Sequence, residues 1–244
     1  MDLNGRVALV TGGAVRVGRA ISLALAERGA VVAVNYCHSE SAAHALAEEI
    51  QRRGGQAAPF RADLSVTAEI DRLVDAVTAQ FGPIDVLVNN AAIFPRTPLE
   101  SVTEETWDQV MAINLKAPFF CARRVGREMV RRGAGKIVNI ADVSACHPWP
   151  SYIPYGVSKA GLVALTYGLA RALAPAVQVN AVAPGAVLFP ESFSEKERRR
   201  ALALVPLKRE GGAEAVARTV LFLIEGPDYI TGAVVPVDGG RLLL

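Results

Sequence analysis

Short apolar segments alternate with longer amphipathic ones along the whole chain, and this alternation restricts the fold more than any other sequence feature. Short apolar runs bounded by turn residues are typical of buried strands, and an apolar period of about 3.6 residues is typical of helices. The predicted strands are Val7–Val10, Val31–Val34, Gln56–Phe60, Val86–Val88, Lys136–Ile140 and Val177–Ala181, with a last strand between Tyr229–Gly232 and Val237–Gly240. The predicted helices are Gly18–Arg28, Ser41–Arg53, Thr67–Phe81, Glu104–Arg132, Tyr155–Leu173 and Ala213–Glu225. Strands that alternate with helices form βαβ units, so we predict an α/β fold: a doubly wound parallel sheet with helices on both faces.

The chain shows no break in composition that would divide it. Its 244 residues suit one α/β domain, and no repeat or low-complexity linker interrupts the alternating pattern. With 51% hydrophobic residues, the chain can bury a large core. We therefore predict a single domain over residues 1–244.

Charge and cysteine usage exclude several classes of partner. The formal net charge is +2, which is too small to favour a nucleic acid or an anionic membrane as partner. No apolar run reaches the roughly 18 residues that a membrane span needs. The three cysteines form no disulfide pattern and the first residues do not resemble a signal peptide, so we expect a cytoplasmic protein. The three histidines lack ligand spacing, and we predict no metal site.

A glycine-rich turn, Thr11–Gly18, joins the first predicted strand to the first predicted helix. Glycines such as Gly12 let the backbone approach a pyrophosphate, and the helix N-terminus presents free N–H groups to it. Arg16 stands where such turns usually carry a further glycine, and its guanidinium could pair with phosphate oxygens. An ordinary glycine turn is the alternative, but the strand–turn–helix context favours a dinucleotide site that includes Gly12, Arg16 and Val17.

The end of the second strand indicates which dinucleotide is bound. An NAD site usually has a carboxylate about 20 residues after the glycine turn, where it bonds the ribose 2′-hydroxyl. Here Asn35 takes that place and does not repel a 2′-phosphate, while His38 and Ser39 can donate hydrogen bonds to one. We therefore predict NADP(H) as the cofactor. The alternative is a polar loop in which Ser39 or Ser41 caps the next helix.

Three further segments follow predicted strands, at the edge of the sheet where ligands bind in such folds. Asp63–Leu64 suits a contact with adenine, chiefly through the Asp63 carboxylate. Asn90–Ala91 belongs to a turn of small residues that can pass beneath the cofactor, and Pro184–Gly185 should abut the nicotinamide.

Tyr155 and Lys159 lie four residues apart at the start of a predicted helix, so their side chains share a face. An ammonium beside a phenol favours the phenolate, and we expect Lys159 to lower the pKa of Tyr155 from its usual value of about 10. Tyr155 could then donate or accept a proton near neutral pH. For this pair taken alone, a tyrosine and a lysine that share a helix face by chance are the alternative.

Features outside these motifs could serve the substrate. Phe94 follows the Asn90–Ala91 turn and could stack on a flat ring, although a core-edge aromatic explains it nearly as well. Asn114 lies in an apolar helical segment, where it could hold a backbone carbonyl and an ordered water behind Lys159, or simply be exposed. The segment 186–207 has weak periodicity, and we interpret it as a mobile lid with a solvated basic face, or with charges that meet an acidic substrate tail.

Taken together, these motifs closely resemble the short-chain dehydrogenase/reductase family over the whole chain. The motifs are the Thr11–Gly18 turn, Asn89–Ala91, Asn114, Tyr155 with Lys159, Pro184–Gly185 and Asp238–Gly240. The resemblance implies one Rossmann-type domain with a nicotinamide cofactor, commonly in a homotetramer. It also implies that Tyr155 is the acid/base, that Lys159 binds ribose and lowers the tyrosine pKa, and that Asn114 anchors a proton-relay water.

Two departures from the general pattern resemble the pteridine reductase branch of that family. Thirteen residues before Tyr155, where the family has its catalytic serine, this chain has Asp142, and Arg16 replaces the middle glycine of the turn. Phe94 falls where that branch has a phenylalanine that holds the pterin against the nicotinamide. A carboxyl at position 142 can bond the ring N–H groups of a pterin, whereas an ionised one would repel the oxyanion that forms from a ketone.

We therefore predict an NADPH-dependent reductase that converts a dihydropterin or dihydrofolate to its tetrahydro form by hydride transfer. The predicted catalytic residues are Asp142, Tyr155, Lys159 and Asn114, and the predicted substrate contacts are Arg16, Phe94, Asp142 and Tyr155. Two alternatives stay open: an NADPH-dependent carbonyl reductase of 3-oxoacyl thioesters or sugars, and a non-catalytic sensor that binds NADP(H).

Overall fold

Seven parallel strands form one sheet in the computed structural model, which describes residues 1–190 and 193–243. The strands are β1 (Val7–Val10), β2 (Val31–Tyr36), β3 (Gln56–Arg61), β4 (Ile84–Asn89), β5 (Gly135–Ile140), β6 (Val177–Pro184) and β7 (Val234–Val237). They lie side by side in the order β3-β2-β1-β4-β5-β6-β7, and each neighbouring pair is parallel. The chain direction across the sheet reverses between β1 and β4, which places the topological switch point at their carboxyl ends.

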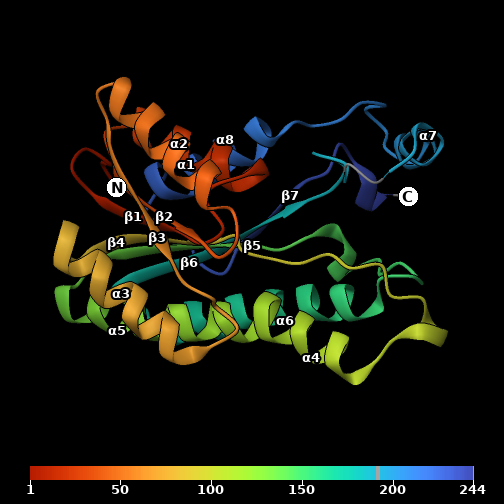
Figure 1. Cartoon of the computed structure of the whole chain (residues 1–244), viewed down its shortest axis with the longest axis horizontal. Coiled ribbons are helices and arrows are strands. Elements are labelled where there is room, and N and C mark those ends of the chain that lie inside the picture. The colour runs from red at the N-terminus through yellow and green to blue at the C-terminus, as the bar shows by residue number, and fades with distance from the viewer. Residues whose placement is uncertain (191–192, 244) are drawn as a thin grey trace.

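Helices cover both faces of the sheet (Figure 1). One layer contains α1 (Arg16–Glu27), α2 (Glu40–Arg52) and α8 (Ala213–Glu225). The opposite layer contains α3 (Thr67–Phe81), α4 (Glu104–Met111), α5 (Ala117–Arg132) and α6 (Ile153–Ala172). The doubly wound α/β fold predicted from the alternating pattern is therefore confirmed. Among the residues described, no helix combines the length and apolar character needed to cross a bilayer.

The sheet separates two hydrophobic cores, and successive strand residues point alternately into each. In β1, Ala8 and Val10 pack in the core beneath α1 and α8, whereas Val7 and Leu9 pack in the core on the α3–α5 side. Because both faces are covered, the strand is apolar throughout rather than alternating. Burial of each Val or Leu side chain contributes about 1.5–3 kcal/mol, so the central strands are held by both layers.

The predicted helix Glu104–Arg132 is one rod interrupted by a wider turn. A single π-helical turn, Ala112–Lys116, separates α4 from α5 without breaking the rod, and it contains the buried Asn114. Such turns insert an extra residue into a helix and occur often at functional sites. The apolar period is nearly unchanged by one insertion, which is why the sequence pattern predicted an uninterrupted helix.

The structure describes residues 186–190 and 193–207 of the segment interpreted as a mobile lid, and this described part is more regular than its weak periodicity suggested; its mobility stays a prediction. It contains the helix α7 (Glu195–Ala203), which begins with a capping box in which Ser194 and Glu197 bond each other's backbone N–H groups. α7 lies away from the sheet and buries none of its own residues, so its sequence carries no apolar stripe. The capping box, Ser194 followed three residues later by Glu197, is the sequence signal that could have predicted this helix.

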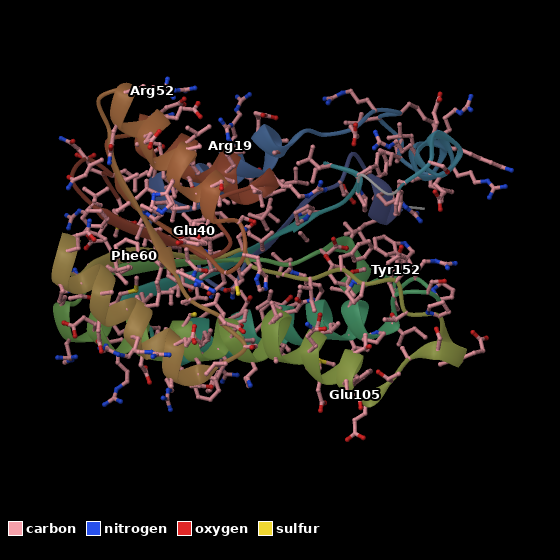
Figure 2. The ribbon with its side chains drawn as sticks, viewed as in Figure 1. Arg19, Glu40, Arg52, Phe60, Glu105 and Tyr152 are labelled. Carbon is pink, nitrogen blue, oxygen red and sulfur yellow. The ribbon has the colours of Figure 1, made fainter. Side chains whose placement is uncertain are left out.

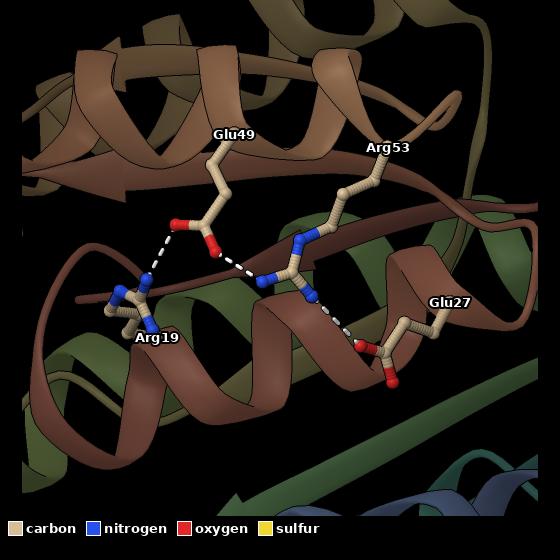
Figure 3. A network of polar contacts seen from close by, with 4 residues as sticks. All are labelled: Arg19, Glu27, Glu49 and Arg53. Carbon is tan, nitrogen blue, oxygen red and sulfur yellow. Dashed lines mark hydrogen bonds and ion pairs between the residues drawn. The ribbon is translucent and has the colours of Figure 1, made fainter.

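A surface network joins α1 to α2 (Figure 3). Glu49 on α2 accepts hydrogen bonds from Arg19 on α1 and from Arg53, and Arg53 also reaches Glu27 with a 3.2 Å contact. Arg19, Arg53 and Glu27 are about half exposed, so each pair contributes at most about 1 kcal/mol. The network links the solvent-facing sides of α1 and α2.

Candidate active site

The glycine turn between β1 and α1 is tied to the end of β4. The Thr11 hydroxyl accepts the N–H groups of Asn90 and Ala91 at 2.9 and 3.1 Å, and the Asn90 amide donates to the carbonyls of Thr11 and Gly12 at 2.9 and 3.0 Å. The two segments that flank the switch point therefore form one rigid unit. Thr11 was part of the predicted motif, but its role as the central acceptor was not foreseen.

Two glycines in this turn leave no room for a side chain. A Cβ on Gly18 would lie 2.1 Å from the carbonyl oxygen of Gly12, and Gly12 itself has a φ of +58° with Ala91 close by. No side-chain hydrogen bond caps the N-terminus of α1 among the described residues. The bare turn and the uncapped N–H groups fit the pyrophosphate of a dinucleotide. Val17 lies partly buried beside this turn and packs on the core.

Asn35 has a different role from the one predicted. Its side chain is only 2% exposed; its oxygen accepts the Gly12 N–H at 3.2 Å, and its amide donates to three backbone carbonyls at 3.3 Å. All hydrogen-bonding groups of this side chain are engaged within the protein, so the prediction that Asn35 binds the cofactor is wrong for its side chain. Asn35 instead supports the glycine turn by accepting the Gly12 N–H. The sequence spacing alone could not distinguish this structural role from a ligand contact.

The ends of β2 and β3 carry the remaining residues predicted to hold the adenosine half. His38 is exposed, and Ser39 precedes α2 without using its hydroxyl as a cap, so both can reach a ligand. The Asp63 carboxylate accepts the Ser65 N–H at 2.9 Å, and hydrogen bonds from Ser65 hold the pKa of Asp63 below its usual range. Leu64 is buried in the core, which leaves only its backbone for an adenine contact.

Asp142, Tyr155 and Lys159 meet at the carboxyl end of β5. One Asp142 oxygen accepts the Ser144 N–H at 2.7 Å, and the other accepts the Tyr155 hydroxyl at 3.1 Å. Lys159 lies one turn of α6 after Tyr155; its Nζ donates to the Ile140 carbonyl at 2.7 Å and lies 5.6 Å from the centre of the tyrosine ring. Local structure explains the contact: Asp142 caps the short turn Val143–Ala145 while α6 brings Tyr155 back over it.

The electrostatics of this group differ from the expectation. Burial, and then the neighbouring Asp142 carboxylate, raise the pKa of Tyr155 well above its usual value. Burial also raises the pKa of Asp142, against the Ser144 hydrogen bonds that lower it, and burial lowers the pKa of Lys159 to about 8. The prediction that Lys159 brings the tyrosine pKa down is wrong in this structure, because desolvation and Asp142 outweigh the ammonium. Tyr155 is therefore kept as a proton donor, the form that a reduction requires.

Asn114 stands behind this group rather than in it. Its side-chain oxygen accepts the Ile93 N–H at 2.9 Å, and its amide donates to the Ile93 carbonyl at 3.0 Å and to the Ser158 hydroxyl at 3.2 Å. The backbone carbonyl expected as a partner is present. These bonds fix the segment that leads to Phe94 against α6, whereas the proton-relay water stays a prediction.

Phe94 lies in a group of four aromatic rings at the site. Its ring is stacked on Tyr152 with centroids 4.2 Å apart and planes 2° apart, and it meets the edges of Tyr155 at 4.6 Å and Trp149 at 6.1 Å. Thr97 pairs with Tyr152 in an isolated bridge, which holds the two segments together. Figure 2 shows Tyr152 at the same end of the molecule as α7 in Figure 1. Tyr152 and Trp149 were missed, although both lie in the Asp142–Lys159 stretch.

Pro184–Gly185 ends β6, as predicted for a segment beside the nicotinamide. A Cβ on Gly185 would lie 2.8–2.9 Å from Asp238, so this strand end and the one after β7 pass very close together. Arg16 reaches across from the glycine turn to this side, where its Nη2 donates to the carbonyls of Leu188 and Phe189 at 3.1 and 3.2 Å.

Comparison with known proteins agrees with this arrangement. A family model described as enoyl-(acyl carrier protein) reductase matches residues 13–241. A 3-oxoacyl-[acyl-carrier-protein] reductase of Staphylococcus epidermidis is 39% identical over 240 residues, which are 97% of this chain and 98% of the relative. A double mutant of a short-chain dehydrogenase/reductase from Serratia marcescens has a TM-score of 0.92 and 33% identity, and covers 99% of this chain and 100% of its own.

The chain belongs to the short-chain dehydrogenase/reductase family. Within that family it is an NAD(P)H-dependent oxidoreductase. A blue fluorescent protein from a metagenomic library, solved in complex with NADPH, has a TM-score of 0.91 and 35% identity, with 99% of each chain covered. These relatives do not support the predicted pteridine reductase branch, because the curated relative is a 3-oxoacyl reductase.

The pKa of Asp142 makes the stability of this reductase depend on pH. Because the folded-state pKa is raised, the favourable contribution of this group is present at low pH and is lost as pH rises through that pKa. The variant Asp142→Asn should therefore match the wild type below the ordinary carboxyl pKa of about 4 and exceed it in free energy of unfolding as pH rises. Urea unfolding at several pH values measures this difference.

Asp63→Asn is the matched control, because hydrogen bonds lower the pKa of Asp63. Its contribution has the opposite sign: it is present above the ordinary carboxyl pKa and lost as pH falls through the lowered one. Asp63→Asn should accordingly lose stability at neutral pH. An Asp142→Asn variant that loses stability in the same way would contradict the raised pKa.

Proposed function

We propose that this enzyme is an NADPH-dependent reductase of pterins that converts a dihydropterin or dihydrofolate to its tetrahydro form. One observation carries the proposal: the position of the family's catalytic serine holds a partly buried carboxyl, Asp142, which accepts the hydroxyl of Tyr155 at 3.1 Å. A simple hydroxyl would suffice to polarise a ketone. A carboxyl paired with the tyrosine suits a substrate that must receive a proton on a ring nitrogen.

The chemistry follows from the protons that this group holds. Reduction of a C=N bond adds a hydride to carbon and a proton to nitrogen; bound NADPH supplies the hydride. Tyr155 donates its hydroxyl proton to the nitrogen, and the O–H bond of the Asp142 carboxylic acid then passes a proton to the phenolate oxygen. Burial raises the pKa of Asp142 above its usual value, which is the direction that this proton transfer needs. Lys159 adds positive charge next to the tyrosine ring, which offsets the negative charge left on the pair.

A second candidate, an NADPH-dependent reductase of 3-oxoacyl thioesters, is favoured by similarity alone. The relative from Staphylococcus epidermidis carries that name at 39% identity over nearly its whole length. A protonated Asp142 can also donate a hydrogen bond to a ketone oxygen, as a serine hydroxyl does. The two candidates therefore share Tyr155 and Lys159 and differ in what Asp142 must do.

Direct assay separates the candidates. NADPH oxidation would be followed with dihydrobiopterin, dihydrofolate and acetoacetyl-coenzyme A between about pH 4 and pH 8. The pterin proposal expects turnover of a dihydropterin that exceeds turnover of the thioester. Absence of pterin turnover over the whole range sinks the first candidate, and thioester turnover then establishes the second. NADPH binding without any turnover supports the non-catalytic sensor, against which the assembled Asp142–Tyr155 pair argues.

Phe94→Ala should weaken binding of a flat substrate more than binding of an aliphatic one. Loss of the aromatic surface removes about 0.5–1.5 kcal/mol of stacking besides the buried area, so we expect KM for dihydrobiopterin to rise about tenfold. KM for acetoacetyl-coenzyme A should change less than about threefold. Phe222→Ala is the control, because Phe222 is an exposed aromatic on α8. Equal changes in KM for both substrates would contradict the stacking role.

Cofactor choice and assembly complete the proposal. His38 and Ser39 are available for a 2′-phosphate, and the end of β2 carries no carboxylate that would repel it.

The predicted homotetramer stays a prediction. A groove of about 800 Å³ lined by α4, the π turn, α5 and α6 exposes apolar side chains, with Phe119 41% exposed beside it, and a second copy of this chain would cover it.

A further inference from the structure

Arg16 has a backbone conformation that favours glycine. Its φ is +53°, in the left-handed region, where a Cβ crowds the following carbonyl. Glycine adopts this region without that penalty. A side chain at such a position must offset the strain through its own contacts, so the partners of the guanidinium are informative.

Those partners lie in the segment that follows β6, far from the glycine turn in the chain. Nη2 of Arg16 donates to two successive carbonyls, Leu188 at 3.1 Å and Phe189 at 3.2 Å, in a segment more than 170 positions away along the chain. The glycine turn faces the expected pyrophosphate, and the segment after Gly185 borders the expected nicotinamide. One side chain therefore connects the expected pyrophosphate site to the segment beside the expected nicotinamide.

We name residues Ala186–Phe189 the strap, because this segment leads from β6 toward α7. The first half of the strap is held by backbone hydrogen bonds: the N–H groups of Gly211 and Gly212 donate to the carbonyls of Ala186 and Val187, each at 3.0 Å. Its second half is held by Arg16, and by the Phe189 N–H, which donates to Glu210 at 3.0 Å. The Phe189 ring also stacks on Phe193, just before α7, with centroids 6.0 Å apart. Through this ring contact, a change in the position of the strap would affect the residue that precedes α7.

We propose that Arg16 is a positioning residue that couples cofactor binding to the strap. A guanidinium has five N–H donors in a planar fork, and Nη2 serves both strap carbonyls. The remaining donors suit an oxygen of the pyrophosphate at the N-terminus of α1. A bound phosphate charge fixes the guanidinium, and the fixed guanidinium holds the strap and α7 in place. The proposal rests on the nicotinamide cofactor of the family and not on the identity of the substrate.

Hydrogen–deuterium exchange with NADPH as the only ligand tests the coupling. In the wild type, NADPH should slow exchange of the Phe189 amide and of the α7 amides by about tenfold or more. Arg16→Gly suits the left-handed backbone and should fold. It should raise the Kd for NADPH about tenfold through loss of a charge-assisted contact. At saturating NADPH, slowing at Phe189 and α7 should fall below about threefold, while β1 stays protected.

Two further variants sharpen the result. Arg19→Ala removes an arginine from the same helix whose partner is Glu49 and not the strap, so it should behave as the wild type (Figure 3). Arg16→Lys keeps the charge but lacks the fork, so it should recover part of the NADPH affinity without the strap protection. Full protection of Phe189 and α7 in Arg16→Gly or in Arg16→Lys overturns the proposal, as does an unchanged Kd for NADPH in Arg16→Gly.

Discussion

Replacing Asp142 by serine is expected to lower kcat/KM for dihydropterin by about 10²- to 10⁴-fold, the range for loss of a positioned acid. The Kd for NADPH should change by less than about twofold, because the hydrogen bonds of Asp142 within the described part of the chain go to Ser144 and Tyr155. The serine hydroxyl can still bond a ketone oxygen but supplies no carboxyl proton to Tyr155. Stopped-flow reduction and NADPH titration measure the two effects separately.

The same variant also ranks the two candidate functions. If the enzyme is a 3-oxoacyl reductase, Asp142→Ser restores the residue that the family has at this place, and thioester reduction should be kept or improved. Asp142→Asn is the matched comparison, because it preserves shape and charge neutrality without an acidic proton. Pterin reduction that survives in Asp142→Asn, or a loss of NADPH affinity equal to the loss of pterin activity, is incompatible with the proton role.

Removing the Tyr155 hydroxyl should affect every substrate. Tyr155→Phe keeps the edge contact with Phe94 but deletes the proton donor, so we expect kcat to fall by about 10²- to 10⁴-fold for pterin and thioester alike. The pKa of Tyr155 is raised, so the hydroxyl stays protonated over the whole assay range and the loss should not vary with pH. Single-turnover measurements with preloaded NADPH report the chemical step directly.

Tyr152→Phe is the control for this experiment. Tyr152 is stacked on Phe94, and its hydroxyl has no protein hydrogen bond among the described residues, so the variant keeps the ring and loses only an oxygen. Its kcat should change by less than about threefold. A comparable loss in Tyr152→Phe would mean that Tyr155 acts through packing of the aromatic group and not as the proton donor.

The outcomes for Asp142 and Arg16 are independent of each other. The Asp142 variants test the chemistry at the carboxyl end of β5, and their readout is the choice of substrate. The Arg16 variants test the connection between the glycine turn and the strap, and their readout is protection by NADPH. Failure of the pterin proposal would therefore leave the Arg16 proposal standing, because the cofactor is common to both candidate functions.

The sequence predicted those features of this enzyme that depend on residues close together in the chain. Buried strands and amphipathic helices have short periods, so the alternating pattern was enough for the doubly wound sheet and for most element boundaries. The glycine turn is also a local feature in part, since a Cβ on Gly18 would clash with the Gly12 carbonyl of the same turn. The Tyr155–Lys159 spacing belongs to one helix turn. Asp142 was placed beside them by the resemblance to the family, whose catalytic serine stands thirteen residues before the tyrosine.

Only the tertiary structure decided which of these residues face a ligand and how they titrate. Asn35 lies at the expected strand end, yet burial and four hydrogen bonds turn it into a support for the glycine turn. The pKa of Tyr155 rises instead of falling because desolvation depends on atoms from several segments that pack around it. The contacts of Arg16 join segments more than 170 residues apart. Burial and long-range contacts are properties of the packed chain, so no local pattern contains them.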